Sequence, residues 1–254
     1  MNTENTELTT VSAESANPLA TLNRFNQPNE VATRDMASVN QARWVPSLNI
    51  AYGTSEACKK RIAQPGDFVL GGQTKLGQTI KVIICDYRIR ACIWDKDQNK
   101  FGDSCYHLSS SKVDVKDDTE YQAFINQKLP KGQELQTGVE FLLYIPEQNN
   151  FAVLFMKKTL SSYTQAIWSC GVGRLIELTT TLIQGKKGRD WYGLKVTPLN
   201  QAVRGSTLQI PGQTLKYDID IPVDLFEQNH ELFVNPMTTA PVEDADESIP
   251  DVQR

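Results

Sequence analysis

One stretch constrains the fold of this chain more than any other: TIKVIICDYRIRACIWD, residues 79–95. It is rich in β-branched and aromatic residues, which favour strands, and it is too long for one flat strand. In its second half apolar residues alternate with Arg88, Arg90 and Trp94. Side chains two residues apart share one face of a strand. The pattern therefore predicts a long strand that presents these three side chains together.

Weaker patterns surround this stretch. They predict strands at 65–72, 190–198 and 214–226, a buried hairpin at 139–158, and helices at 54–62, 117–129 and 161–183. Gly171, Gly173 and three consecutive threonines count against the last helix. Together the elements predict a β-rich α+β domain, which is an OB-like antiparallel barrel or a curled sheet with two or three helices.

Charge and composition divide the 254 residues into three parts. Residues 1–41 are rich in Asn, Thr, Ser, Glu and Ala and lack an apolar period, so we expect a disordered arm. Residues 236–254 hold five acidic residues and one basic residue, which predicts an acidic disordered tail. Between them, 42–235 carries 23 basic and 20 acidic residues although the whole chain has a net charge of -4. We expect this middle part to form one β-rich nucleic-acid-binding domain.

Metal-site and disulfide patterns are weak. Five cysteines are widely scattered and form no CxxC pair, which argues against a disulfide framework. Cys105 and His107 could begin a metal site, but no second ligand pair follows at zinc spacing. We therefore expect no metal and no cofactor.

Catalytic signatures are absent as well. The sequence has no GxSxG elbow, no HExxH and no Walker A motif. Asp218, Asp220 and Asp224 are the one carboxylate cluster that a two-metal nuclease could use, and solvated strand edges explain them equally well. We expect that the protein is not an enzyme.

Membrane and export signals are missing too. No apolar run approaches the roughly 18 to 20 residues that cross a bilayer. The first residues lack the basic and apolar regions of a secretory signal. These patterns predict a cytoplasmic protein with no membrane partner.

The last candidate site in the sequence combines basic and aromatic residues. Residues 157–204 contain eight basic residues and two acidic ones. Proteins that bind single strands combine such cations, which contact phosphates, with aromatic rings on which bases stack. The predicted DNA-binding residues are Arg88, Arg90, Trp94, Lys157, Lys158, Arg174, Lys186, Lys187, Arg189, Trp191, Tyr192 and Lys195.

Alternatives stay open for several of these residues. Arg88 and Arg90 could instead belong to a solvated face or to cross-strand ion pairs. Trp191 and Tyr192 are neighbours on a predicted strand, so one of them must point inward. Trp168 and Phe155 are expected to serve packing.

Several features resemble a known class of proteins. WVPSLNIAYGTSEACKK, followed by PGDFVLGG, looks like the opening of phage-encoded proteins found among replication and transcription genes. An OB-like order of hairpins with an intervening helix, a basic core and an acidic C-terminal tail together resemble bacteriophage-type single-stranded DNA-binding proteins. The likeness covers residues 44–198 as an order of elements. It implies a protein that holds unwound DNA during replication, recombination or transcription in an infected bacterial cell.

The resemblance also implies a role for the acidic tail. In that class the tail contacts replication proteins and competes with DNA for the basic groove. The role would fall to Glu243, Asp244, Asp246, Glu247 and Asp251. The tails of that class end in an apolar or aromatic residue, whereas this one ends Val252-Gln253-Arg254.

Two further functions remain open from the sequence. A structural or virion assembly protein without DNA affinity would also fit a β-rich body with an N-terminal arm. A transcription cofactor overlaps the leading hypothesis, since a single-strand binder can hold a promoter open. The expected partners are single-stranded DNA, replication or transcription proteins bound by the tail, and further copies of the chain in a homo-oligomer.

Overall fold

The structure is a computed structural model that describes residues 44–185, 190–199, 207–210, 213–218 and 220–236. For 207–210 and 213–216 only the backbone is described. The chain divides into two compact units, 1–42 and 43–254, and all described residues belong to the second. The predicted arm and nearly all of the predicted tail therefore lie outside the described residues.

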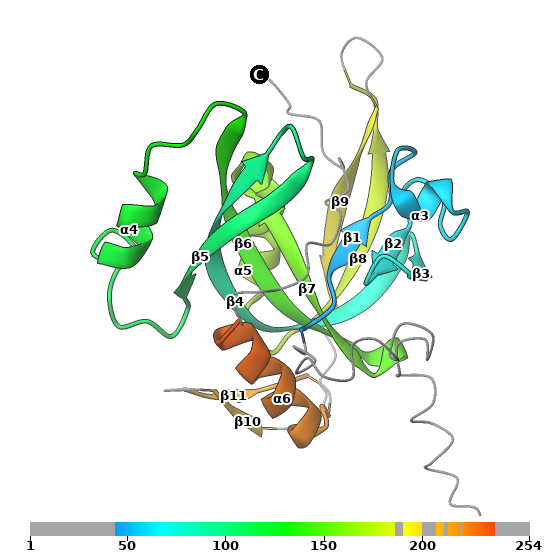
Figure 1. The fold of residues 1–254 in the computed structure, drawn as a ribbon. Coiled ribbons are helices and arrows are strands. Elements are labelled where there is room, and N and C mark those ends of the chain that lie inside the picture. The colour runs from blue at the N-terminus through cyan, green and yellow to red at the C-terminus, as the bar shows by residue number, and fades with distance from the viewer. Residues whose placement is uncertain (1–43, 186–189, 200–206, 211–212, 219, 237–254) are drawn as a thin grey trace, which may run out of the picture. The chain divides into compact units, whose positions relative to one another are not determined.

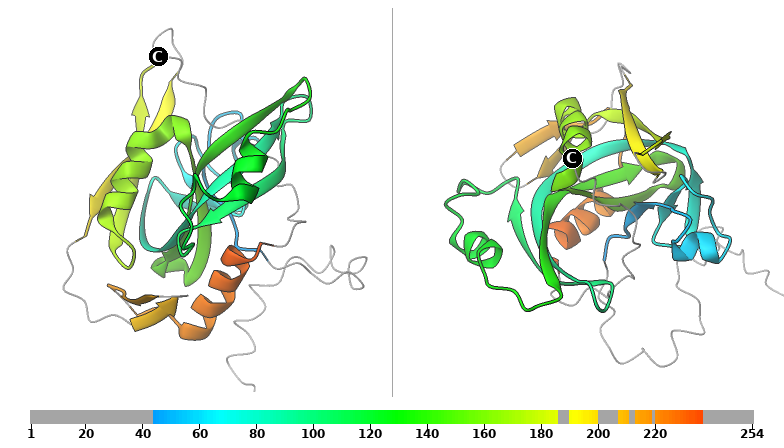
Figure 2. Two further views of the ribbon diagram at one scale, coloured as in Figure 1. Left: turned by 90° about the vertical axis from the view of Figure 1, so that its left-hand side faces the viewer. Right: turned by 90° about the horizontal axis from the view of Figure 1, so that it is seen from above.

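The long β pattern forms a single strand, β4 (Thr79–Asp95), which curves strongly (Figures 1 and 2). It is the central strand of an antiparallel six-stranded sheet with the order β7-β6-β4-β8-β9, and β5 pairs with β4 as a branch. One edge of β4 pairs along most of its length with β6. The other edge pairs first with β8 and then with β5. The bounds are β5 (Lys100–Leu108), β6 (Gln133–Ile145), β7 (Asn150–Lys157), β8 (Leu175–Ile183) and β9 (Trp191–Pro198).

A β-bulge at Cys85 changes which side chains of β4 face the core. Ile84 pairs with Leu143 and Asp86 with Leu142, so Cys85 is an extra residue in the ladder. Such a residue bends the strand and increases its twist. Before the bulge the even-numbered residues face the main core. After it the odd-numbered residues do so: Tyr87 packs on the main core, and Ile89 and Ala91 pack in a separate cluster with Tyr121. The bulge thereby sends Arg88, Arg90 and Trp94 to the opposite face.

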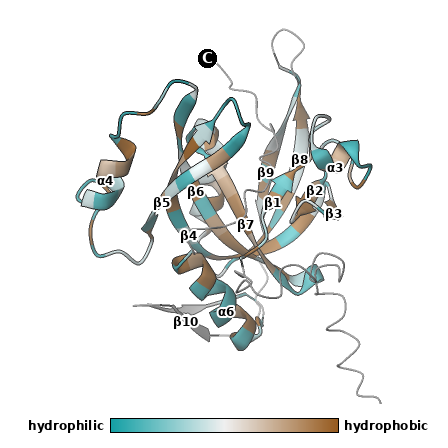
Figure 3. Cartoon of the chain, viewed as in Figure 1, coloured by the Kyte–Doolittle hydropathy of each residue, from teal (hydrophilic) through white to brown (hydrophobic). Residues whose placement is uncertain are grey.

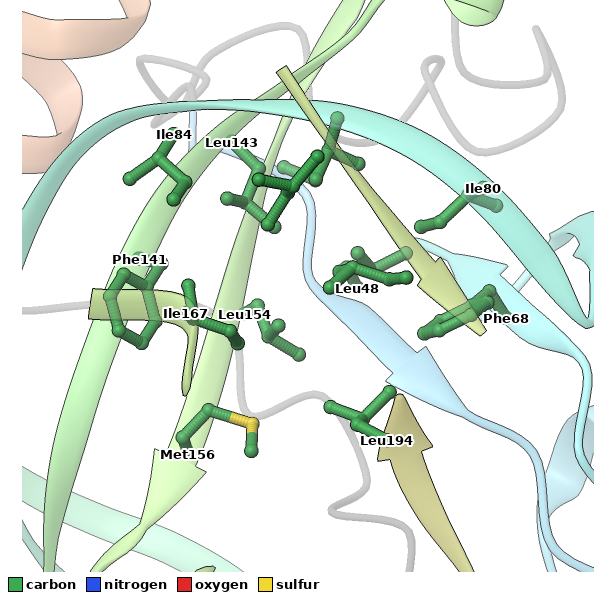
Figure 4. Close-up of a cluster of buried hydrophobic side chains, with 14 of the residues drawn as sticks. Leu48, Phe68, Ile80, Ile84, Phe141, Leu143, Leu154, Met156, Ile167 and Leu194 are labelled. Atoms are coloured by element: carbon green, nitrogen blue, oxygen red, sulfur yellow. The ribbon is translucent and has the colours of Figure 1, made fainter. Parts of the chain in front are cut away.

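The predicted buried hairpin at 139–158 is confirmed. β6 and β7 are joined by η1 (Pro146–Gln148), and Asn149 completes the turn with a positive φ of 45°. Side chains from these strands pack against a small sheet of β1 (Leu48–Ile50), β2 (Phe68–Leu70) and β3 (Thr74–Gly77). Figure 4 shows residues of both sheets meeting in this core, including Leu48, Phe68, Phe141 and Leu143. The prediction of a strand within 65–72 is thus also confirmed.

The prediction of a strand over 214–226 is wrong beyond its first residues. β11 (Gln213–Lys216) pairs with β10 (Thr207–Ile210), and the chain then forms α6 (Val223–Val234) after Pro222. α6 carries both hydrophobic and hydrophilic residues (Figure 3). Its buried residues Phe226, Asn229, His230 and Phe233 recur at helical spacing, which the apparent alternation before it concealed.

α6 covers the middle of the outer face of β4, around the bulge. Its rings pack with Ile83, Cys85 and Tyr217 in a second core. His230 Nε2 lies 2.8 Å from Oδ2 of the buried Asp86, whose Oδ1 accepts from the Ser109 hydroxyl at 2.6 Å. These polar contacts fix α6 to the bulged part of β4, since buried polar groups need partners.

The predicted helix at 161–183 is shorter than expected. α5 (Ser161–Cys170) ends at Gly171, whose φ of 84° suits glycine, and the β-branched threonines that follow belong to β8. The other predicted helices form as α3 (Glu56–Lys59) and α4 (Thr119–Ile125). A short η2 (Lys158–Leu160) precedes α5.

The predicted fold class is confirmed in its coarse form: the described residues form a β-rich, antiparallel α+β structure. They contain four α-helices, one more than the largest number expected. The sheets stay open in the described part of the chain and do not close into a barrel. A single parallel bridge between Ser47 and Val153 connects the start of this unit to the edge of β7.

Candidate functional site

The second half of β4 presents polar and aromatic side chains on the face turned away from α4. Ala91 packs against Tyr121 of α4, so Arg90 and its even-numbered neighbours point the other way. β5 and β7 add rings to the same face through the strand register. We define the cation–aromatic face as six partly exposed side chains: Arg90, Trp94, Phe101, Tyr106, Phe155 and Lys157.

The rings of this face lie close to its cations. The Trp94 and Phe101 ring centroids are 4.9 Å apart with an interplanar angle of 64°, and those of Phe101 and Phe155 are 6.2 Å apart at 88°. The Arg90 guanidinium carbon is 5.3 Å from the Phe101 centroid and 5.2 Å from that of Phe155. The Lys157 ammonium is 6.0 Å from the Trp94 centroid. Ring faces attract cations at such distances, so the cluster holds itself together.

Gly138 makes room for one of these rings. It lies on β6 opposite Arg90 on one side and Lys157 on the other. A Cβ atom at this position would lie 2.8 Å from Cε2 of Phe155, closer than two carbons can pack. The absence of a side chain therefore allows Phe155 to lie across β6 near Arg90.

A buried ion-pair network underlies the face. The Glu140 side chain is 2% exposed, and its two oxygens bind two guanidinium groups. Oε2 accepts from Arg88 Nε at 2.7 Å and from Nη2 at 2.6 Å, and Oε1 accepts from Arg90 Nη1 at 2.6 Å. Arg90 also donates from Nε and Nη2 to the Ser104 hydroxyl, at 3.2 and 3.0 Å.

The network keeps Glu140 and Arg90 charged. Burial would raise the pKa of Glu140, but the Arg90 and Arg88 guanidiniums outweigh it and hold the pKa below its ordinary value. Burial would likewise lower the pKa of Arg90, yet the Glu140 carboxylate outweighs this and raises it. Burial raises the pKa of the nearby Cys92 thiol to about 11, so it stays protonated at neutral pH. The face therefore offers cations and rings, and no thiolate.

Arg88 is enclosed beneath the face. Its guanidinium carbon lies 3.7 Å from the Tyr106 centroid and 4.2 Å from that of Phe233, and Nη1 donates to the Phe233 carbonyl. The side chain is 6% exposed. The predicted DNA contact at Arg88 does not fit this burial, and the cross-strand ion pair, the alternative that the sequence left open, is what the structure contains.

The other predicted residues lie in separate places. Lys158 is exposed at the start of η2, directly after Lys157. Arg174 is exposed and binds Asp218, with 3.2 Å between Nη1 and Oδ1. Lys195 is exposed on β9, two strands away from β4 in the sheet.

Both predicted aromatics of β9 are partly exposed and pack on neighbouring rings. The Trp191 ring packs against the main core and lies 6.1 Å from the Tyr163 ring. Tyr192 packs on Tyr52 at 5.9 Å between centroids. The expectation that Trp168 only serves packing is also incomplete, because it packs on Tyr87 yet is 42% exposed.

Some predicted residues lie outside the described part of the chain. They are Lys186, Lys187 and Arg189, together with the tail residues Glu243, Asp244, Asp246, Glu247 and Asp251.

The three carboxylates considered for metal binding differ in exposure: Asp220 and Asp224 are exposed, whereas Asp218 is not. Asp218 is buried, and its Oδ2 accepts from the Leu175 amide at 2.9 Å while Oδ1 binds Arg174. Among the described residues, no group of three or more His, Cys, Asp or Glu side chains is placed to hold a metal ion. Asp218 thus has a structural role, which is to fix the chain before α6 to β8.

Comparisons with known proteins give no match: no family model, no curated protein and no solved structure resembles the chain significantly. Within the described residues, no helix has the length and apolar character needed to cross a membrane.

Sequence reasoning missed half of the face. Phe101 and Tyr106 were not recognised because no strand was predicted over 100–108, where a bulge between Phe101 and Ser104 breaks the simple alternation. Phe155 was expected to serve packing; it does pack on Phe101, but it is also partly exposed on this face. Glu140 gave a clearer signal, since a lone carboxylate inside the apolar run GVEFLLY indicates a buried partner for a cation.

Proposed function

We propose that this protein binds single-stranded nucleic acid without catalysing a reaction, and that the strand lies over the cation–aromatic face. The observation that supports this most is the gathering of four partly exposed rings with Arg90 and Lys157 on one side of a sheet. Bases stack on such rings, and each stacked base contributes roughly 1 to 3 kcal/mol. The neighbouring cations compensate the charge of the phosphates.

The proposed ligand is DNA bound with little sequence preference. Every base has a flat face, so stacking tolerates any sequence, whereas reading base edges needs a set of fixed donors and acceptors. The resemblance to bacteriophage-type single-stranded DNA-binding proteins extends the proposal to phage replication, recombination or transcription. In that setting the acidic tail would bind protein partners.

Titration of fluorescent oligo-dT by anisotropy across a salt series tests the proposal. The logarithm of the binding constant should fall linearly with the logarithm of the salt concentration, with a slope of about -0.7 for each phosphate contact. A duplex of the same length should compete poorly. An affinity that does not change with salt concentration, or a preference for duplex DNA, would contradict the proposal.

A charge-reversal variant tests whether the basic residues within 186–189 contribute. Reversing the charges of Lys186, Lys187 and Arg189 should weaken binding and leave the fold intact, as far-ultraviolet circular dichroism would show. Unchanged affinity would restrict the interface to the cation–aromatic face.

An assembly protein without DNA affinity gives a different result. It would form a large closed particle in light scattering and leave oligo-dT anisotropy unchanged. This outcome would replace the proposal of nucleic-acid binding.

A further inference from the structure

The buried network beneath the cation–aromatic face is not electrically balanced. Arg88 and Arg90 are two cations, and both bind the single carboxylate of Glu140. Within the described part of the chain, no second carboxylate forms an ion pair with either guanidinium. The network thus holds one excess positive charge in a largely buried place, where an unbalanced charge is costly.

Of the two guanidiniums, only Arg90 can reach an external partner. Arg88 lies between two rings and donates to a carbonyl of α6. The Arg90 side chain is 18% exposed, three times as much as that of Arg88. A guanidinium has five N–H donors. The contacts of Arg90 with Glu140 and Ser104 use three of them, which leaves one on each terminal nitrogen.

We propose that Arg90 forms an oxyanion subsite at the centre of the cation–aromatic face, and that this subsite takes one phosphate group of the bound strand. The planar fork of a guanidinium matches two oxygens of a phosphate. Phe101 and Phe155 flank it at 5.3 and 5.2 Å, and a less polar surrounding strengthens the attraction between charges. The subsite deepens the proposed function and rests on it.

The bound phosphate would supply the anion that the network lacks. Glu140 positions Arg90, because its Oε1 holds Nη1 at 2.6 Å and thereby fixes the plane of the fork. Trp94 and Phe101 lie beside this point, so bases adjoining the phosphate would meet rings. An anion without bases should therefore bind the subsite, but more weakly than a strand.

The variants Arg90→Gln and Arg90→Lys test the subsite in the full chain. Arg90→Gln should lower the affinity for oligo-dT roughly tenfold or more, as expected for a lost charge-assisted hydrogen bond. It should also reduce the magnitude of the salt slope by about 0.7. Arg90→Lys should keep the slope and lose part of the affinity, because it keeps the charge and loses the fork. The matched control Lys128→Gln removes an exposed charge between α4 and β6 and should change neither value.

A loss of folding stability should not account for weaker binding by Arg90→Gln. Arg90→Gln leaves Arg88 and Glu140 as a balanced pair, so its thermal unfolding temperature should remain close to that of the wild type. Inorganic pyrophosphate should raise the unfolding temperature of the wild type and not that of Arg90→Gln.

The outcomes separate the subsite from the proposed function. Oligo-dT binding with unchanged affinity and slope in Arg90→Gln would overturn the subsite and leave the function standing. A wild-type protein that binds no oligonucleotide would overturn the function. In that case, stabilisation by pyrophosphate that depends on Arg90 would still support an oxyanion subsite, and its absence would overturn it.

Discussion

Arg88 joins β4 to α6, because its guanidinium donates to the main-chain carbonyl of Phe233 and its guanidinium carbon lies 4.2 Å from the centroid of the Phe233 ring. The same guanidinium binds Glu140, which binds Arg90. A continuous set of contacts therefore runs from the last turn of α6 to the cation–aromatic face. Arg88 is thus the residue through which the helix and the face stabilise each other.

Replacing Arg88 should loosen α6 more than the rest of the protein. Arg88→Met deprives Oε2 of Glu140 and the Phe233 carbonyl of donors, while Arg90 still balances the charge of Glu140. Each buried acceptor left without a donor costs about 1 to 3 kcal/mol of unfolding free energy. Hydrogen exchange should show faster exchange of the α6 amides than of the β6 amides. The control Arg174→Met breaks an ion pair whose arginine is 65% exposed, so it should cost at most about 1 kcal/mol. Equal effects of the two variants would refute this role of Arg88.

Glu140 makes the stability of the protein depend on acid pH. Its pKa is below the ordinary value in the folded protein, so the carboxylate stabilises the fold above its unfolded pKa of about 4.3. This contribution is lost as the pH falls through the lowered pKa. Glu140→Gln leaves two buried cations without an anion and should cost about 3 to 5 kcal/mol at neutral pH. In urea unfolding, the difference in unfolding free energy between wild type and variant should shrink as the pH falls below the pKa of the unfolded carboxyl. A difference that stays constant with pH would show that the carboxylate charge is not its cause.

A second carboxylate with a lowered pKa lies at the start of α4. The hydrogen bond from His107, 2.7 Å between Nδ1 and Oδ2, is the main cause of the low pKa of Asp118, and the Tyr121 amide adds to it. His107→Ala should therefore raise the pKa of Asp118 toward the ordinary value. In the wild type, Asp118 stabilises the fold above its unfolded pKa, and this stabilisation is lost as the pH falls through the lowered pKa. The stabilisation should be smaller in the variant. Carboxyl titration by NMR measures the shift, and an unchanged pKa would assign the effect to the helix amide alone.

The sequence predicted the parts of the fold that local pattern determines. β4 and the hairpin of β6 and β7 follow from their apolar and β-branched runs, which need no distant partner to be recognised. α6 was missed because the alternating residues before it continued a strand pattern toward Phe226. What decides between strand and helix there is packing on Ile83 and Tyr217, and this depends on the tertiary structure.

The candidate site shows the same limit. Alternation along β4 placed Arg88, Arg90 and Trp94 on one face, and the register agrees. The sequence left open whether the two arginines are solvated or paired, because Glu140 lies about fifty residues away and meets them only through the pairing of β4 with β6. Arg88 is buried whereas Arg90 is partly exposed, so only Arg90 can contact a ligand. This difference depends on where α6 packs.

Removing the largest ring of the cation–aromatic face should weaken the proposed binding without weakening the fold. Trp94 is partly exposed and contacts Phe101 and Lys157, so Trp94→Ala should lose roughly 1 to 3 kcal/mol of oligo-dT binding, the contribution of one stacked base. Because stacking carries no charge, the salt slope should stay the same, unlike in Arg90→Gln. Trp168→Ala is the matched control, since that ring is 42% exposed on α5 and lies outside the face. Wild-type affinity in Trp94→Ala, or an equal loss in both variants, would remove Trp94 from the proposed interface.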